Sequence, residues 1–333
     1  MPNPPGHQAI SRRDLLRGAS AAALTAAAVP LGLRLPARTV PSQPDSLSRF
    51  VAGQMRIAHV PGLAAALVRD GDVAWSAGFG WASIAHEVAV TPETVFMLAS
   101  VSKTLTATAL MQVKEEGLLG LDDDVNGLLP FPVRNPSRLD APITPRMLLT
   151  HTASIRDTWS VLGSVYTHGD SPIPLGDFLR QYLTPGGTYY RTSNFADEDP
   201  GTAYAYCNTA LAGYLVESTI GVPFDRRSRQ RIFEPLGMRE TSWHLAGLPA
   251  HDVATPYAYV PSTGGYRPYG QYGYPDYPDG QLRTSAAQLA RFLSAFVDYG
   301  RFRGTRILEH DTAAEMRRDQ VPAIVRGQGL IWY

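Results

Sequence analysis

A serine and a lysine that lie three residues apart, Ser100 and Lys103, are the residues best suited to chemistry in this chain. They precede an apolar run that ends at Gly117 and predicts a buried helix beginning at Ser100. Residues three apart on a helix share a face, so the amine of Lys103 can reach the hydroxyl of Ser100. An adjacent base activates a serine as a nucleophile, and the unpaired N–H groups of a helix N-terminus suit a developing oxyanion.

The same serine could instead be an ordinary helix N-cap, because Ser-x-x-Lys is a weak pattern. Composition bears on this choice, since Lys103 and Lys114 are the only lysines among 30 basic residues. An arginine does not give up its proton in a protein, whereas a desolvated lysine does. The motif alone leaves both interpretations open.

A second chemical element is Tyr206-x-Asn208, which follows a Pro-Gly loop. A phenol beside a lysine ammonium is expected to have a lowered pKa, so Tyr206 could take the proton of Ser100 and later return it. Asn208 could hold a substrate amide or orient Lys103, because an amide both donates and accepts. Cys207 is a poor rival nucleophile, since no histidine lies near it in sequence.

The first 40 residues are interpreted as an export leader. Paired arginines, Arg12-Arg13, precede an alanine-rich apolar run from Gly18 to Leu33, which is typical of the twin-arginine route. The alternative is a membrane anchor, but Pro30 and Arg34 interrupt a run that is short for a span. We therefore expect a periplasmic or extracellular protein with no stable membrane span after cleavage. Thirty basic and thirty acidic residues balance, so nothing favours nucleic acid as a partner.

Several elements of the mature chain follow from pattern. Residues 46–58 are amphipathic and predict a helix, and Asp70-Gly71 between two apolar runs predicts a hairpin. Further predicted helices span residues 144–151, where His151 is expected to be packed, and residues 209–220 and 285–299. The Tyr-, Pro- and Gly-rich residues 256–280 predict a loop that either lines an apolar cleft or packs rigidly. The last five residues resemble the start of a buried strand.

Taken in order, the motifs of the chain resemble the serine beta-lactamase and penicillin-binding protein superfamily. The pattern is most similar to the class C beta-lactamase, D-aminopeptidase and carboxylesterase branch, over about residue 47 to the end. The motifs that carry the resemblance are Pro61-Gly62-Leu63, Gly78-Phe79-Gly80, Thr94-Val95-Phe96, Ser100-Val101-Ser102-Lys103, Leu148-Leu149-Thr150-His151-Thr152, Tyr206-Cys207-Asn208, Pro235-Leu236-Gly237-Met238 and Tyr277-Pro278-Asp279-Gly280.

The resemblance implies an α+β, beta-lactamase-like fold for residues 47–333, with an antiparallel sheet flanked by helices. The sheet part would comprise residues 47–97 and 278–333, and a mostly helical part residues 98–277. Ser100 would be the acylated nucleophile, Lys103 the proton-transfer lysine, Tyr206 the base and Asn208 a substrate contact. No metal or organic cofactor is implied, and the substrate would be a small molecule or a peptide.

One departure from the family pattern concerns its third motif, Lys- or His-x-Gly on a strand near the C-terminus, which the sequence lacks. We therefore expect that the C-terminal strands are missing from this chain. Two hypotheses follow. One is an exported hydrolase that opens an ester or amide (a beta-lactam, a D-amino-acid peptide or a carboxylic ester) through an acyl-enzyme on Ser100. The other is a truncated, non-catalytic relative that binds cell-wall peptides. No Gly-x-Ser-x-Gly or His-Glu-x-x-His sequence supports another hydrolase class.

Overall fold

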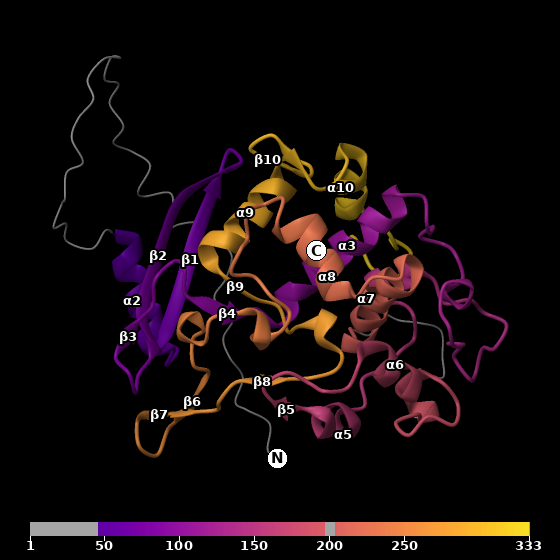
Figure 1. The fold of residues 1–333 in the computed structure, drawn as a ribbon, viewed down its shortest axis with the longest axis horizontal. Coiled ribbons are helices and arrows are strands. Elements are labelled where there is room, and N and C mark those ends of the chain that lie inside the picture. Colours follow the sequence, from indigo (N-terminus) through magenta and orange to yellow (C-terminus); the bar gives the residue numbers. More distant parts are fainter. Residues whose placement is uncertain (1–45, 197–203, 333) are drawn as a thin grey trace.

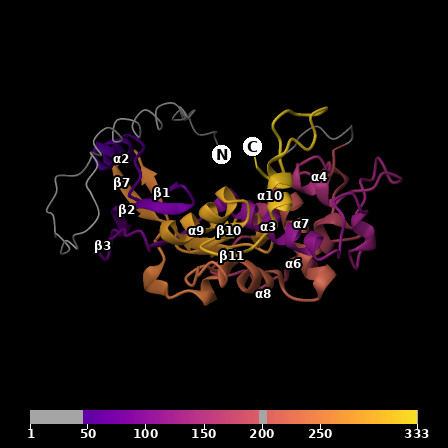
Figure 2. The ribbon, with the colours of Figure 1, turned by 90° about the horizontal axis from the view of Figure 1, so that it is seen from above.

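A computed structural model describes residues 46–196 and 204–332 of the chain. A small antiparallel sheet lies on one side of the molecule and a mostly helical part on the other, in both views of the ribbon (Figures 1 and 2). This mixture of antiparallel strands and helices confirms the expected α+β fold class. The predicted leader, residues 1–40, lies outside the described residues.

The sheet is built on the predicted hairpin, which the structure confirms. Strand β1 (Gly62–Arg69) pairs antiparallel with β2 (Asp72–Ser83), from Gly62 opposite Gly80 to Arg69 opposite Asp72. The two turn residues, Asp70 and Gly71, have φ values of 52° and 79°, as a tight hairpin turn requires. Strand β3 (Val88–Ala89) extends the sheet on the far side of β2. Helix α9 (Ala286–Val297) packs against β1 and β2, and α2 (Ser46–Ile57) lies beside this sheet (Figure 1).

The helical part is organised around α3 (Ser102–Glu115), which contacts α7 (Tyr206–Ile220) along its length. Most residues of both helices are buried, including polar ones such as Thr106 and Thr108. A helix that is buried on nearly every face belongs to the core of the protein. These two helices therefore form the rigid centre that carries the candidate site.

A short strand pair joins the two parts. Strand β4 (Val95–Met97) pairs with β9 (Arg283–Ser285), from Val95 opposite Ser285 to Met97 opposite Arg283. The backbone N–H of Leu98 continues this pairing by donating to Leu282 O at 2.8 Å. The segment that leads into Ser100 is thereby held beside the segment that follows Gly280.

The Tyr-, Pro- and Gly-rich segment contains strands as well as loop. β6 (Tyr257–Val260) pairs with β7 (Gly265–Pro268), and β8 (Tyr272–Gly273) pairs with the distant β5 (Thr167–His168). The other elements are α4 (Pro145–Leu149), α5 (Trp159–Leu162), α6 (Leu175–Leu183), α8 (Phe224–Ser228), α10 (His310–Arg317), β10 (Arg301–Phe302) and β11 (Thr305–Arg306).

Three local expectations were wrong. Ser100 lies in a 3-10 turn, Ala99–Val101, just before α3, and is not the first residue of the α-helix. Tyr206 begins helix α7 where a turn was expected. Residues 329–332 form no strand; Leu330 and Ile331 are buried, but their N–H groups donate to Met316 O and Leu149 O, so the backbone bends into the helical part.

Along the described ranges, none of the helices combines the length and the apolar character that crossing a membrane requires.

Candidate active site

The candidate nucleophile, Ser100, sits exposed at the mouth of α3. The residue before it, Ala99, has a φ of 48°, a left-handed conformation that costs an L-residue roughly 1–2 kcal/mol. This tight turn joins β4 to α3 and leaves the Ser100 hydroxyl at the surface, with the start of the helix directly behind it. The turn therefore places the hydroxyl at the N-terminal end of α3, whose partial positive charge favours a developing oxyanion.

Lys103 lies one helical turn on and is only 1% exposed. Its Nζ is 3.4 Å from Ser100 Oγ and donates to the backbone carbonyl of Asp279 at 2.6 Å. Burial lowers the pKa of Lys103, while the carboxyl groups of Asp279, Asp157 and Asp276 oppose that shift. A buried amine with a lowered pKa can accept a proton from a neighbouring hydroxyl.

Two tyrosines surround this pair, and the sequence pointed to only one of them. The Tyr204 hydroxyl donates to Ser100 Oγ at 2.6 Å. Tyr206, the predicted base, places its ring face 4.4 Å from Lys103 Nζ, and the Tyr204 ring centre is 5.1 Å from the same nitrogen. The structure thus brings Ser100, Lys103 and Tyr206 together and adds Tyr204.

The expected lowering of the phenol pKa does not occur. Burial raises the pKa of both Tyr204 and Tyr206, and the contact of each with Ser100 only partly offsets it. Desolvation disfavours a phenolate, and nearby Asp157 and Asp279 add negative charge that disfavours it further. The tyrosines are therefore neutral donors at neutral pH, which leaves Lys103 as the more basic partner of Ser100.

Asn208 is fully buried one turn into α7. Its Nδ2 lies 3.4 Å from Nδ1 of His151, and its Oδ1 has no hydrogen-bond partner among the described residues. His151 is packed, as expected, with its ring 4.6 Å from that of Tyr204. Burial and the positive charge of Lys103 lower the pKa of His151 to about 4, so this ring is neutral at neutral pH.

Three buried or half-buried carboxyl groups lie behind the site, and the sequence had not singled them out. Asp157 accepts from the N–H groups of Tyr206 at 2.8 Å and Cys207 at 3.3 Å, which caps the start of α7. Asp276 and Asp279 are 3% and 1% exposed, and burial raises the pKa of both carboxyl groups. Of these three carboxyl groups, only that of Asp279 lies in a motif that the sequence analysis named, Tyr277-Pro278-Asp279-Gly280. Nothing in the sequence indicates that Asp279 contacts Lys103, because the two residues lie 176 positions apart.

Cys207 does not compete as a nucleophile. It is fully buried, and burial raises the pKa of its thiol well above the usual value. A thiol of this kind stays protonated and inert.

Comparisons with known proteins show the family to which the chain belongs. A family model described as Beta-lactamase matches residues 47–332. Penicillin-binding protein 4 of Amycolatopsis lactamdurans is 29% identical over 283 residues, which cover 78% of this chain and 66% of that protein. A D-aminopeptidase of Gluconobacter oxydans is 32% identical over 183 residues, which cover 54% of this chain and 31% of that protein.

Among solved structures, an octameric penicillin-binding protein homologue from Pyrococcus abyssi matches with a TM-score of 0.64 and 25% identity, over 85% of this chain and 63% of that one. The chain therefore spans about two thirds or less of the length of these relatives. Because the family model extends from the first described helix to the last described residue, the chain belongs to the Beta-lactamase family, within the serine beta-lactamase and penicillin-binding protein superfamily.

Proposed function

We propose that this protein is a serine hydrolase that opens an ester or an amide through an acyl-enzyme on Ser100. One observation carries the proposal: Ser100 Oγ lies 2.6 Å from the Tyr204 hydroxyl and 3.4 Å from the buried amine of Lys103. A hydroxyl placed between a proton acceptor and a proton donor is the arrangement that nucleophilic catalysis requires. Relatives named penicillin-binding protein and D-aminopeptidase support the choice of an acyl-transfer reaction.

The proposed steps begin with neutral Lys103, whose Nζ accepts the Ser100 proton as Oγ attacks the carbonyl carbon. The carbonyl electron pair moves to oxygen, and we propose that the backbone N–H of Ser100 donates a hydrogen bond to that charge. Collapse of the intermediate breaks the ester or amide bond. The leaving oxygen or nitrogen takes the proton that the Lys103 ammonium carries, while the Tyr204 hydroxyl, which lies 2.6 Å from Ser100 Oγ, donates a hydrogen bond that helps the leaving group depart. Water then attacks the acyl-enzyme by the reverse sequence.

Tyr206 and Asn208 have supporting roles in this proposal. The Tyr206 ring faces Lys103 Nζ, so its negative π face stabilises the ammonium formed after proton transfer. The base role that the sequence assigned to Tyr206 stays open, because its hydroxyl also lies near Ser100. Asn208 is proposed to orient the site from within the core, because it is fully buried and its Nδ2 lies 3.4 Å from Nδ1 of His151. The substrate contact implied by the family resemblance would need its buried Oδ1 to become accessible.

The test is covalent labelling of the purified protein with a fluorophosphonate and with a fluorescent penicillin, together with turnover of a nitrophenyl ester. We expect labelling and turnover by the natural protein and neither by Ser100→Ala. Ser262→Ala, in the exposed turn between β6 and β7, is the matched control and should behave like the natural protein. Equal labelling of Ser100→Ala would refute the proposal. Reversible binding of cell-wall peptides without turnover would support the non-catalytic alternative.

We also propose export by the twin-arginine route, on the basis of Arg12-Arg13 and the apolar run behind them. A fusion of residues 1–45 to a reporter that is active only outside the cytoplasm tests it. We expect export of the natural fusion and its loss on double substitution of both arginines by lysine. Export that persists in that variant, or in a host without the twin-arginine translocase, would contradict the proposal.

A further inference from the structure

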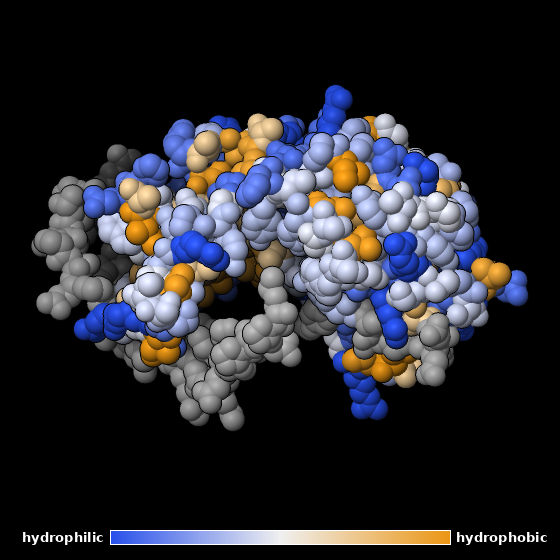
Figure 3. Space-filling view, turned by 90° about the horizontal axis from the view of Figure 1, so that it is seen from below, coloured by the Kyte–Doolittle hydropathy of each residue, from blue (hydrophilic) through white to orange (hydrophobic). Residues whose placement is uncertain are grey.

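A cavity of about 680 Å³ opens on the face of the molecule that carries β5, β8 and the β6–β7 hairpin. Four tyrosines line it, namely Tyr166, Tyr257, Tyr269 and Tyr272, together with Pro256 and the β5 residues. Figure 3 views the molecule from this side and shows a hollow near the centre of the face. The tyrosines come from two segments about ninety residues apart in sequence, so the cavity is a product of the tertiary fold.

A row of aromatic rings leads from the cavity lining towards the turn that carries Ser100. The Tyr166 ring lies 5.9 Å from that of Tyr272 and 4.8 Å from that of Tyr274. A Cβ placed on Gly280 would lie 2.6 Å from the Tyr274 hydroxyl and 3.5 Å from the carbonyl carbon of Ala99, so Tyr274 lies against the turn that carries Ser100. The Tyr206 phenol is near enough to Tyr166 to add to the rise in the pKa of the Tyr166 hydroxyl, after the larger effects of burial and of Asp276 and Asp279. The cavity therefore lies beside the candidate site, with Tyr166 on the side that faces it.

The lining chemistry selects the kind of group that would bind. No lysine, arginine, aspartate or glutamate is among the described lining residues, and His168 and the phenols supply the polar atoms. Tyr166 and Tyr269 are 40% and 62% exposed, so their rings are available to a ligand. Aromatic rings pair favourably with other rings at centroid distances of about 4.5–7 Å. An uncharged aromatic group matches this cavity better than an anion, a cation or a flexible polar chain.

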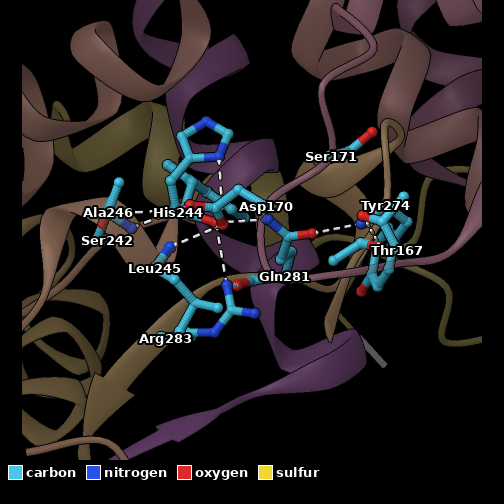
Figure 4. Close-up of polar contacts among 12 residues, drawn as sticks. Thr167, Asp170, Ser171, Ser242, His244, Leu245, Ala246, Tyr274, Gln281 and Arg283 are labelled. Carbon is cyan, nitrogen blue, oxygen red and sulfur yellow. Dashed lines mark hydrogen bonds and ion pairs between the residues drawn. The ribbon is translucent and has the colours of Figure 1, made fainter. Parts of the chain in front are cut away.

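Hydrogen bonds from buried side chains fix the backbone of Tyr272 and Tyr274, beside the cavity (Figure 4). The Oε1 of Gln281 accepts from the N–H of Tyr274 at 2.7 Å, and its Nε2 donates to Trp243 O at 2.8 Å. The buried guanidinium of Arg283 donates to the carbonyl of Tyr272 at 2.5 Å. Asp170, two residues after the end of β5, accepts from the N–H groups of Leu245 and Ala246 at 2.8 and 2.9 Å. A preformed cavity of this kind binds with little ordering cost.

We propose that this cavity is a substrate subsite, which holds an uncharged aromatic group of the ester or amide whose carbonyl is placed at Ser100. The inference rests on the proposed function, because it gives that reaction a substrate class, namely esters or amides that carry an aryl group. Tyr166 forms the wall of the cavity on the side towards Ser100, and Tyr269 covers the outer side of the bound aryl ring.

Two pairs of matched esters test the preference, one with the aryl group on the acyl side and one with it on the leaving side. The first pair is methyl 3-phenylpropionate against methyl hexanoate, and the second is benzyl acetate against butyl acetate. We expect the natural protein to favour the aryl member of at least one pair roughly tenfold in kcat/KM, as one well-filled apolar pocket can provide. An active enzyme with equal kcat/KM within both pairs would overturn the proposal.

Substitutions then locate the preference. Tyr166→Ala and Tyr269→Ala should each lower the ratio of aryl to alkyl kcat/KM severalfold, mainly through KM. The matched control is Tyr299→Ala, a tyrosine that is 38% exposed and does not line the cavity, and it should leave the ratio unchanged. A ratio that neither cavity substitution alters would place the aryl group elsewhere and overturn the proposal.

Failure of the subsite is distinguishable from failure of the proposed reaction. If no ester is turned over and Ser100 takes no label, the proposed function fails. The cavity is then tested by the binding of an aryl amide, without turnover. Calorimetric titration of Ser100→Ala with 3-phenylpropanamide should show binding that the added Tyr166→Ala substitution weakens and the added Tyr299→Ala substitution does not. No binding at millimolar concentration, or equal binding by all three proteins, would overturn the subsite.

Discussion

Lys103 Nζ donates a 2.6 Å hydrogen bond to the carbonyl oxygen of Asp279, a residue 176 positions away in the chain. This bond fixes the amine where its Nζ also lies 3.4 Å from Ser100 Oγ. Because Lys103 is buried, the carbonyl replaces water as its partner, and the ammonium form loses hydration. The contact therefore orients the amine while burial lowers its pKa.

Lys103 is expected to act as the proton acceptor, and its replacement tests this. Lys103→Met should lower kcat/KM for a nitrophenyl ester by roughly 100- to 10,000-fold, the usual contribution of a positioned base. Lys103→Arg should be equally impaired, because a guanidinium keeps its proton. The only other lysine, Lys114, lies on the same helix and pairs with Glu315 at 2.7 Å, so Lys114→Met is the matched control and should retain activity. An active Lys103→Arg enzyme would contradict the role.

The two tyrosines are expected to differ in importance. Tyr204→Phe removes the hydroxyl that donates to Ser100 at 2.6 Å, so kcat should fall roughly 100-fold or more. Tyr206→Phe keeps the ring that faces Lys103 and should cost clearly less. Tyr214→Phe, on the same helix, is the control for a general effect on α7. Steady-state kinetics on all three variants decides the matter, and a larger loss in Tyr206→Phe would restore the base role that the sequence assigned to Tyr206.

His151 is expected to make stability fall in acid. Its pKa is lowered from 6.5 to about 4 in the folded protein, so the unfolded chain binds a proton at a higher pH than the folded one. The contribution of neutral His151 to the free energy of unfolding is therefore fully present above about pH 6.5 and is lost as the pH falls towards 4. The loss amounts to roughly 3 kcal/mol at most.

The measurement is the difference in unfolding free energy between the natural protein and His151→Gln, from urea denaturation at several pH values. The difference is needed because the raised pKa of Asp276 acts in the opposite direction, losing stability as the pH rises. We expect the advantage of the natural protein to shrink between pH 7 and pH 4. His251→Gln, at an exposed position, is the control for a general effect of replacing a histidine, and a flat profile for His151→Gln would refute the assignment.

Asp157 is expected to stabilise the start of α7. Its carboxyl accepts from two N–H groups of the first turn, those of Tyr206 and Cys207. Asp157→Ala should lower the free energy of unfolding by about 1–2 kcal/mol, since a lost helix cap leaves N–H groups unpaired. The control is Asp177→Ala, in the first turn of α6, where the carboxyl is largely exposed and the cost should stay below about 0.5 kcal/mol. Equal effects of the two substitutions in thermal denaturation would contradict this role.

Local signals in the sequence were sufficient for the elements whose partners are near in the chain. The hairpin around Asp70-Gly71 follows from two apolar runs and a turn that needs positive φ, and the pairing of Ser100 with Lys103 follows from helical spacing. The helix predicted over residues 144–151 was equally readable, and in the structure the Thr144 hydroxyl accepts from Met147 N at its start. Each of these depends on the geometry of a few consecutive residues.

The remaining features of the site depend on contacts between distant segments and on burial. The sequence could not show that Tyr204, rather than Tyr206 two residues later, donates its hydroxyl to Ser100. The path of the chain into α7 decides which of the two hydroxyls meets Ser100. The direction of the phenol pKa shifts was wrong in the sequence analysis, since desolvation outweighs the attraction of Lys103 and depends on how deeply each ring is buried. Spacing along the chain thus specified the candidate nucleophile and its amine, because both lie within one helical turn. Packing of remote segments specified the carbonyl that holds the amine, the tyrosine hydroxyl that donates to Ser100 and the aromatic cavity.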